Sequence, residues 1–269
     1  MVARLLDVDF PISAFVGTYE WPLIKGGRWR KIQIPIRYGF FRHPSVGPVL
    51  IDTGYTDRVT SGTRSFELRL YSAGLRPQLS EGGQLKAFLR ARGLCAADVR
   101  AVIVTHFHAD HISAARDLPN AQFYASREAY EELKRYGHFK RILYGVFLDL
   151  LPDNFGDRLT SFKGTRTTAG PLGLGPCFDV FDDGSVLVVP LPGHAMGHVG
   201  VVFPGAEPPL LYAADVEWLR DALPPGRSGL AAAIIGHDRK AGEASGAKAL
   251  AFEQAGGRVI LCHDPEELR

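Results

Sequence analysis

Short apolar runs alternate with polar, glycine-rich turns along most of the chain. Runs of about four to eight apolar residues between turn residues are typical of buried strands, and apolar residues at a spacing of three or four are typical of helices. Together these patterns predict strands with helices between them, arranged as two packed sheets with helices outside. The runs place strands at 31–41, 47–54, 99–106, 121–126, 177–181, 185–191, 198–204, 210–216 and 258–264, and helices at 81–93, 127–136 and 239–255.

Two segments depart from this rhythm. Residues 55–80 have no clear period and are predicted to form a long loop. Residues 138–151 are strongly apolar and aromatic, and a segment rich in Gly, Thr and Pro follows them as far as Pro176. We therefore expect a single domain over 1–269 with an apolar insertion at about 137–176. The second half of the chain repeats the order of the first half weakly, as an internal duplication would.

Composition and charge exclude several classes of protein. Of the 269 residues, 46% are apolar and 22% are charged, which is typical of a globular chain with a sizeable core. The formal net charge is only +2 and no basic tract is present, so we expect no nucleic-acid partner. The three cysteines are too few and too far apart for a disulfide framework, which favours a cytoplasmic location. No apolar run is long enough to span a bilayer, and we expect no membrane partner.

The strongest chemical signal lies directly after the strand at 99–106. His106, His108, Asp110 and His111 place four metal-capable side chains within six residues. Residues two apart in an extended segment point the same way, so His106 and His108 can meet at one ion. The chain must then turn, which lets Asp110 and His111 reach a second ion. Imidazole and carboxylate ligands suit zinc, iron or manganese.

Three more metal-capable side chains stand where predicted strands end. His194 follows Pro192-Gly193, where the backbone turns sharply, while Asp215 and His263 follow two later strands. Functional side chains are often found where a rigid strand becomes a loop. By the alternation of a strand, Cys262 should face away from the site that His263 joins.

With these motifs the chain resembles the metallo-β-lactamase superfamily. The residues that carry the resemblance are T-H-F-H-A-D-H at 105–111, D-T-G at 52–54, P-G-H-A-M-G-H at 192–198, and then Asp215 and His263 in the family's order. The resemblance spans about residues 31–264. It implies an α/β fold, an αββα sandwich, with a binuclear metal centre at one edge.

The resemblance also implies a role for each matching residue. Asp52 would orient the metal loop, and His198 would be structural. Asp110 and Asp215 would take part in catalysis as well as in metal binding. Two divalent transition-metal ions would be held, His106, His108 and His194 binding the first, Asp110, His111 and His263 the second, and Asp215 both. Zinc is the first expectation, with iron, manganese and cobalt as alternatives.

Within the superfamily, the chain is most similar to acyl-homoserine lactonase-like enzymes. L-P-G-H-x-x-G-H-V-G at 191–200 and C-H-D-P at 262–265 carry this likeness. It implies hydrolysis of a small-molecule ester or lactone by a hydroxide that bridges two metals. Four alternatives stay open: a thioester hydrolase of the hydroxyacylglutathione type, a phosphotriester or phosphodiester hydrolase, a mononuclear iron sulfur dioxygenase, and a non-catalytic binding protein.

Several aromatic residues are candidates for the substrate pocket. Lactonases of this branch carry a Tyr three residues after the bridging Asp, and here that position is Trp218. An indole can donate a hydrogen bond but cannot usefully give up a proton. The insertion at 137–176 can supply an apolar wall, a dimer surface or core packing, so a homodimer also stays open. Aromatic candidates for the wall are Phe107, Phe139, Tyr144 and Phe147.

Overall fold

The computed structural model describes residues 6–265, and the chain divides into two compact units. The N-terminal unit contains, of the described residues, 6–17 and 35–161. The C-terminal unit contains residues 18–34 and residues from 162 onward. Each unit is built on a six-stranded sheet. Whether the chain forms a single domain stays a prediction.

The sheet of the N-terminal unit has the strand order β1-β4-β5-β7-β8-β9. The β1–β4 and β4–β5 pairs are antiparallel, and the strands from β5 to β9 pair in parallel. Parallel pairing brings the carboxyl ends of β5 and β7 to the same edge of the sheet. The strands are β1 Leu6–Asp9, β4 Gly39–His43, β5 Gly47–Ile51, β7 Ala101–Ile103, β8 Gln122–Ala125 and β9 Leu159–Ser161.

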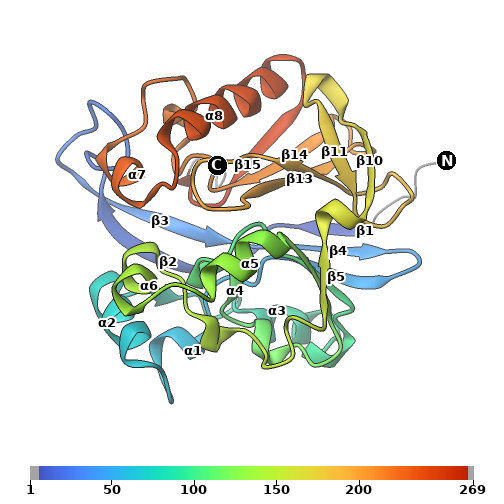
Figure 1. The fold of residues 1–269 in the computed structure, drawn as a ribbon, viewed down its shortest axis with the longest axis horizontal. Coiled ribbons are helices and arrows are strands. Elements are labelled where there is room, and N and C mark those ends of the chain that lie inside the picture. The colour runs from blue at the N-terminus through green and yellow to red at the C-terminus, as the bar shows by residue number, and fades with distance from the viewer. Residues whose placement is uncertain (1–5, 266–269) are drawn as a thin grey trace. The chain divides into compact units, whose positions relative to one another are not determined.

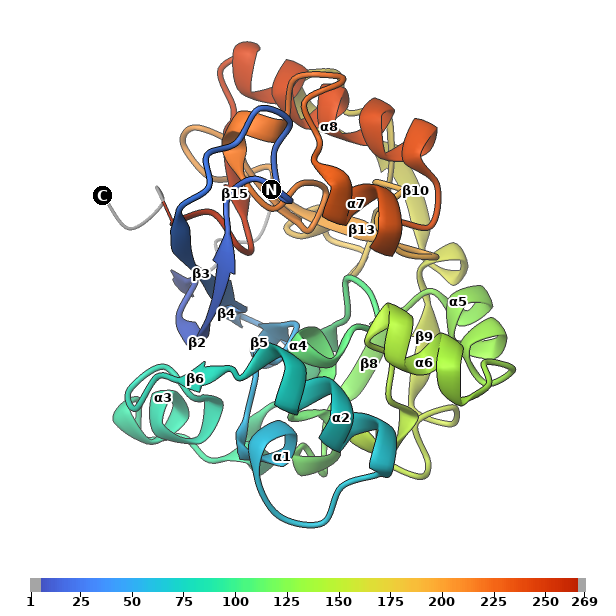
Figure 2. The same cartoon turned by 90° about the vertical axis from the view of Figure 1, so that its left-hand side faces the viewer.

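Six helices belong to this unit, and two of them, α2 and α6, pack side by side (Figures 1 and 2). Helix α2 begins at the cap residue Ser65, whose hydroxyl accepts a hydrogen bond from the Leu68 amide. The helices are α1 Asp57–Thr60, α2 Phe66–Leu75, α3 Leu85–Ala91, α4 Ala109–Ile112, α5 Arg127–Leu133 and α6 His138–Tyr144.

A smaller sheet has the order β3-β2-β6, with strands β2 Ile12–Tyr19, β3 Lys31–Arg37 and β6 Gln78–Leu79.

The sheet of the C-terminal unit has the order β10-β11-β12-β13-β14-β15. Its pairs are antiparallel except the last, β14–β15, which is parallel. Helix α8 runs along this sheet (Figure 1). The strands are β10 Arg166–Ala169, β11 Pro176–Asp179, β12 Leu187–Pro190, β13 Val199–Phe203, β14 Leu210–Ala214 and β15 Arg258–Leu261, and the helices are α7 Leu230–Ile235 and α8 Arg239–Gln254.

Helix α8 forms because its local signals and its buried face agree. The Asp238 side chain caps its first turn by accepting a hydrogen bond from the Ala241 amide at 3.0 Å. Ala249 and Phe252 lie one turn apart and are buried in one core with Val259 of β15. The helix thereby fixes the strand that leads to His263. The predicted helix at 239–255 is confirmed.

The structure corrects two predictions about secondary structure. Residues 55–80 are not one loop, because they contain α1, α2 and β6. Helix α2 escaped detection because its large apolar side chains Phe66 and Leu70 are 73% and 53% exposed and give no apolar stripe toward a core. The run at 31–41 forms two strands, β3 and β4, which are separated at Tyr38.

The segment expected to be an insertion also joins the sheets. Within 137–176, β9 is the last strand of one sheet and β10 the first strand of the other. Its first part contains α6 and the turn at Leu148–Leu150 and precedes β9. Throughout the described residues, helices that could cross a bilayer are absent.

Candidate metal centre

The histidine motif, residues 105–111, belongs to the N-terminal unit and spans the turn after β7 and most of α4. His108 is the residue before the first turn of α4, so the chain changes from extended to helical within the motif. The rings of His106 and His108 have centroids 4.4 Å apart, and those of His106 and His111 are 3.9 Å apart. All three rings are buried. The structure therefore brings His106 and His108 close together, as the spacing predicted, and also places the His111 ring beside that of His106.

Asp52 organises this turn from the end of β5. Its Oδ1 accepts a hydrogen bond from the Thr105 amide at 2.8 Å, and its Oδ2 accepts one from the Thr105 hydroxyl at 2.8 Å. The same Oδ2 lies 2.8 Å from His111 Nδ1. Asp52 has φ +60°, a left-handed conformation that costs energy in a residue other than glycine. The backbone is strained where its carboxylate turns toward the motif.

Further hydrogen bonds hold α4 in position. The His111 carbonyl accepts hydrogen bonds from the Thr53 amide at 2.8 Å and from the Thr53 hydroxyl at 3.1 Å. The Ala109 amide donates to the Gly145 carbonyl at 2.9 Å, which ties α4 to the end of α6. Asp110 is buried, with Oδ2 3.6 Å from His111 Nε2. A ligand on a short, multiply anchored turn loses little entropy when it binds an ion.

In the C-terminal unit, Asp215 lies between two histidines at the end of β14. Its Oδ2 is 2.9 Å from His263 Nε2 and 3.4 Å from His194 Nε2. The preceding residue, Ala214, has φ +48°, and the register of β14 against β15 shifts between Tyr212 and Ala214. The strained backbone turns the carboxylate toward both histidines.

His194 is positioned by the close approach of its loop to α8. Gly193 has φ +133°, and a Cβ at this position would lie 2.1 Å from the Gly242 amide nitrogen. Only glycine fits, since both the conformation and the contact exclude a side chain. The Ser245 hydroxyl donates to the Pro192 carbonyl at 2.7 Å and holds the loop against the helix.

His198 has the structural role expected of it. Its Nδ1 lies 2.8 Å from the Leu191 carbonyl oxygen, and its Nε2 accepts a hydrogen bond from the Asp215 amide at 3.2 Å. Both ring nitrogens are therefore used by the main chain. The imidazole connects the loop that carries His194 to the strand end that carries Asp215.

Cys262 does not face away from His263, contrary to the prediction. Ligand atoms of Asp215, Cys262 and His263 lie within 4.8 Å of one another. Strand β15 ends at Leu261, so the alternation that would separate neighbouring side chains no longer applies at Cys262. Burial by itself would lower the pKa of His263, but the Asp215 carboxylate outweighs burial and holds that pKa well above its usual range, with Cys262 adding to the rise.

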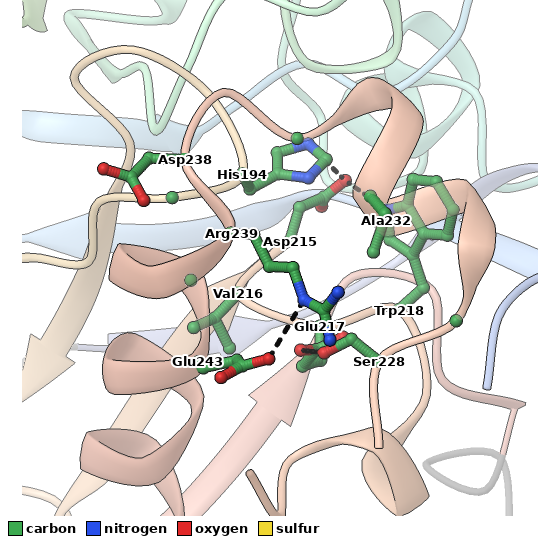
Figure 3. Close-up of a pocket in the computed structure, with 15 residues that line it drawn as sticks. His194, Asp215, Val216, Glu217, Trp218, Ser228, Ala232, Asp238, Arg239 and Glu243 are labelled. Carbon is green, nitrogen blue, oxygen red and sulfur yellow. Dashed lines mark hydrogen bonds and ion pairs between the residues drawn. The ribbon is translucent and has the colours of Figure 1, made fainter. Parts of the chain in front are cut away.

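A small cleft in the C-terminal unit begins at His194 and Asp215 (Figure 3). It encloses about 40 Å³, which is room for a few water molecules. Trp218 lines it, and its indole N–H donates to Asp215 Oδ2 at 3.3 Å. The Trp218 ring meets the rings of His194 and His263 edge to face, with centroids 6.0 Å and 6.4 Å away. Trp218 thus lies beside the candidate ligands, with its N–H engaged by one of them.

Glu217 also lines this cleft, and no sequence pattern predicts it. Its side chain is 7% exposed and accepts a hydrogen bond from the Ser228 hydroxyl. Burial raises the pKa of Glu217 to about 7, against the Ser228 hydrogen bond and with the help of the Glu243 carboxylate. The carboxyl directly precedes Trp218, but no motif distinguishes it from an ordinary surface acid.

The four aromatic residues predicted to form an apolar wall lie in different environments. Phe107 is 3% exposed, and its ring packs on those of Phe155 and Tyr130 in the core of the N-terminal unit. Phe147 is also buried, with its ring 5.0 Å from that of Tyr71. Tyr144 is half-buried beside Tyr136, and Phe139 is 79% exposed on α6. Contact of these four residues with a substrate stays a prediction.

The donors in each unit fit transition-metal ions by their chemistry. The N-terminal unit offers three buried imidazoles and the Asp110 carboxylate, and the C-terminal unit offers a carboxylate between two imidazoles. Neutral imidazole and carboxylate are the ligands that zinc, iron, manganese and cobalt accept in proteins. The contact between Asp52 and His111 is also the kind of support that metal-binding histidines usually have.

Comparison with known proteins identifies the family. The model of the metallo-beta-lactamase superfamily matches residues 46–256. The chain belongs to this superfamily and has its mixed α/β fold. Its relatives are named lactonases and metallo-hydrolases, and together with the family this makes it a metallo-hydrolase. The resemblance drawn from the motifs is confirmed.

The relatives found by sequence include acyl-homoserine lactonases. N-acyl homoserine lactonase AttM of Rhizobium johnstonii is 28% identical over 246 residues, which cover 89% of this chain and 85% of the relative. AttM of Azorhizobium caulinodans is 28% identical over 247 residues, which cover 89% and 86%.

Solved structures support the fold. An AiiA mutant of B. thuringiensis with N-decanoyl-L-homoserine at its active site matches with a TM-score of 0.68 at 16% identity, covering 100% of this chain and 96% of that one. AidC, a dizinc quorum-quenching lactonase, matches with a TM-score of 0.69 at 15% identity, covering 98% and 89%.

Proposed function

We propose that this protein is a binuclear metal-dependent hydrolase of small-molecule lactones and esters. The observation that carries the proposal is the Asp215 carboxylate, whose Oδ2 lies within 3.4 Å of both His194 and His263 in the C-terminal unit. A carboxylate between two imidazoles is suited to bridging two ions. The four donors of the histidine motif supply the remaining ligands that two ions need. Membership of the superfamily and the lactonase relatives support this choice of reaction.

The assignment of ligands follows the family pattern. Two ions of this kind, when bound, supply Lewis acidity for a carbonyl oxygen and a hydroxide at neutral pH. Zinc is the metal we propose, because AidC is a dizinc enzyme and the donors are imidazole and carboxylate. His106, His108 and His194 would hold one ion, Asp110, His111 and His263 the other, and Asp215 both.

The chain's own residues have distinct tasks around that centre. Asp52 holds the His111 ring in one orientation, so that Nε2 is available as a ligand. Asp110 is a buried carboxylate 3.6 Å from His111, and it can pass a proton from the attacking nucleophile to the leaving alkoxide. The Trp218 N–H donates to Asp215, so the indole fixes that carboxylate and limits the space beside it.

The relatives favour a lactone as the substrate, and Trp218 indicates which lactones and esters should react fastest. The AttM relatives are named for acyl-homoserine lactones, and AiiA and AidC structures contain acyl-homoserine products. An indole at position 218 offers no proton to transfer. Substrates with good leaving groups, such as aryl esters and activated lactones, should therefore react faster than unactivated acyl-homoserine lactones.

A hydrolysis panel with metal analysis tests the proposal. Lactones, aryl esters, thioesters and phosphotriesters are offered to the purified protein, and its metals are quantified in the same preparation. We expect turnover of lactones and aryl esters, with about two transition-metal ions per chain. Turnover confined to thioesters or phosphotriesters would contradict the proposed substrate class. One iron per chain with oxygen consumption would identify a sulfur dioxygenase instead.

The proposal names a small molecule as the partner. A homodimer and a cytoplasmic location stay predictions from the sequence.

A further inference from the structure

Two tryptophans form an exposed stack on the segment between β2 and β3. The rings of Trp21 and Trp29 have centroids 5.4 Å apart and planes inclined by only 12°. The Tyr19 ring adds a third member, 4.9 Å from Trp29. Trp29 is 74% exposed and Trp21 is 38% exposed. Large aromatic side chains displayed in this way mark an interaction surface more often than a single exposed apolar residue does.

Hydrogen bonds around Glu20 hold this segment in a defined shape. The Glu20 carbonyl accepts hydrogen bonds from the Leu23 and Ile24 amides at 2.9 Å and 3.2 Å. Its carboxylate accepts from the Arg28 amide at 2.9 Å and from Arg30 Nη2 at 2.7 Å. The Arg30 hydrogen bond lowers the pKa of Glu20 and keeps the carboxylate charged. The stack is therefore presented on an ordered turn, which reduces the entropy lost on binding.

The segment is also strongly cationic. Residues 18–31 contain four basic side chains, all exposed, and Glu20 as the only acid. Glu20 is paired with Arg30, so three cations remain in excess. The basic residues are Lys25, Arg28, Arg30 and Lys31.

Helix α7 begins beside this segment and carries exposed aliphatic side chains. The Gly229 amide donates to the Leu23 carbonyl at 3.0 Å, and the Ala231 amide donates to the Pro22 carbonyl at 2.8 Å. These bonds attach the start of α7 to the aromatic segment. Leu230 and Ile234 lie one turn apart on α7, and each is 54% exposed. The helix contains no charged residue.

We propose that this surface binds the face of an anionic lipid bilayer. It consists of Trp21, Trp29, Leu230 and Ile234 with the basic residues of 18–31, and we call it the tryptophan surface. Tryptophan favours the level of the lipid headgroups, aliphatic side chains enter the acyl boundary, and Lys and Arg attract anionic headgroups. This departs from the absence of a membrane partner expected from the sequence.

The positive charge of the tryptophan surface favours an anionic bilayer as its partner over a second copy of the chain. A symmetric dimer built on the tryptophan surface would bring the same cationic segment of both copies together. Like charges at such an interface repel each other, whereas an anionic bilayer attracts all of them. This surface would bind a bilayer whatever reaction the protein catalyses. If that reaction is the one proposed above, the bilayer would present apolar lactones and esters, which partition into it. Helix α7 would join the two sites, because Leu230 and Ile234 belong to the surface while Ala232 and Ala233 line the cleft at His194 (Figure 3).

Vesicle sedimentation with the full chain tests the proposal. Vesicles of phosphatidylcholine alone are compared with vesicles containing one part phosphatidylglycerol in about three. We expect binding to the anionic vesicles only, decreasing as salt is added. Trp29→Ser should weaken it at least about tenfold, since an interfacial aromatic anchor is lost. Lys25→Gln with Arg28→Gln should weaken it by about 25-fold, at about fivefold per charge.

Matched controls come from the N-terminal unit. Phe66 is 73% exposed, close to the value for Trp29, so Phe66→Ser removes an equally exposed aromatic side chain from another surface. Lys86→Gln with Arg90→Gln removes two exposed charges from α3. Both controls should bind vesicles as the unaltered chain does.

Three results of the sedimentation experiment would overturn the proposal. These are the absence of binding to anionic vesicles, equal binding to neutral vesicles, and an equal loss of binding in the controls. Light scattering adds an independent arm: a dimer that Trp29→Ser dissociates would show that a second copy occupies the tryptophan surface. Hydrolysis of a water-soluble ester should be unchanged in Trp29→Ser, which confirms that the variant is folded.

Discussion

Asp52 Oδ2 lies 2.8 Å from His111 Nδ1, and both side chains are fully buried. When a carboxylate accepts the Nδ1 proton of a histidine, the ring presents its Nε2 lone pair to an ion. Asp52 also receives two hydrogen bonds from Thr105, which begins the histidine motif. One carboxylate thus controls both the tautomer of His111 and the path of the chain into the motif.

Asp52→Asn tests this relationship. An amide at this position can donate to Nδ1 and so favour the opposite tautomer of His111, which places the proton on Nε2. We expect metal affinity to fall by about 10–100-fold, the range typical of residues that orient ligands. The measurement is competition with a chromophoric chelator. Asp57→Asn, at the first residue of α1, is a matched control that should leave affinity unchanged.

Metal stoichiometry follows from the number of donors. Seven side chains are assigned to two ions, so the purified protein should carry about two transition-metal ions per chain. Chelation should abolish hydrolysis, and added metal should restore it. Elemental analysis against protein concentration gives the ratio. A preparation that is folded and fully active with one ion would rule out the binuclear assignment.

Asp215→Ala should affect both ions together. The carboxylate contacts His194 and His263 and also accepts the Trp218 N–H, so in the proposed assignment its loss would remove a shared ligand as well as a structural contact. We expect hydrolysis to fall by at least about 100-fold, at or beyond the upper end of the effects seen for residues that only orient ligands. Turnover and metal content are measured on the same sample. Near-normal values for both would mean that Asp215 does not bridge the ions.

His194 and His198 provide a paired test within one motif. His194→Ala should cost metal and activity, because its Nε2 faces Asp215. His198→Ala should mainly cost stability, about 1–3 kcal/mol, since both of its ring nitrogens are engaged by the main chain. Metal content and thermal unfolding are compared for the two variants. Equal loss of metal from both would show that the ligand in this loop is wrongly assigned.

Trp218→Tyr should change the preference among substrates. A phenol at this position can steady the carbonyl oxygen of a lactone, whereas the indole N–H is engaged by Asp215. We expect lactone turnover to rise about tenfold relative to aryl-ester turnover, which corresponds to roughly 1.4 kcal/mol of transition-state stabilisation. The measurement is the ratio of the two kcat/KM values in each protein. If that ratio is unchanged and the unaltered enzyme is already efficient on acyl-homoserine lactones, position 218 does not set specificity.

The sequence by itself determined the strands and the candidate ligands. Short apolar runs predicted the strands β5, β7, β12, β13, β14 and β15, because buried strands must be apolar whatever packs against them. His106, His108 and His111 were recognisable as a group because their spacing is local, and the structure brings their rings together. The sequence pattern over 239–255 also located α8, which spans Arg239–Gln254.

Only the tertiary structure decided how side chains distant in the sequence meet. Glu217 and Ser228 are eleven residues apart, and no spacing rule pairs them, yet they share a hydrogen bond beside the cleft. The alternation rule failed at Cys262 because β15 had already ended. The stack of Trp21 on Trp29 depends on a turn that Glu20 holds with its carbonyl and carboxylate. Periodicity reports which residues are buried within one element, but contacts between elements depend on where each element ends and how the chain turns there.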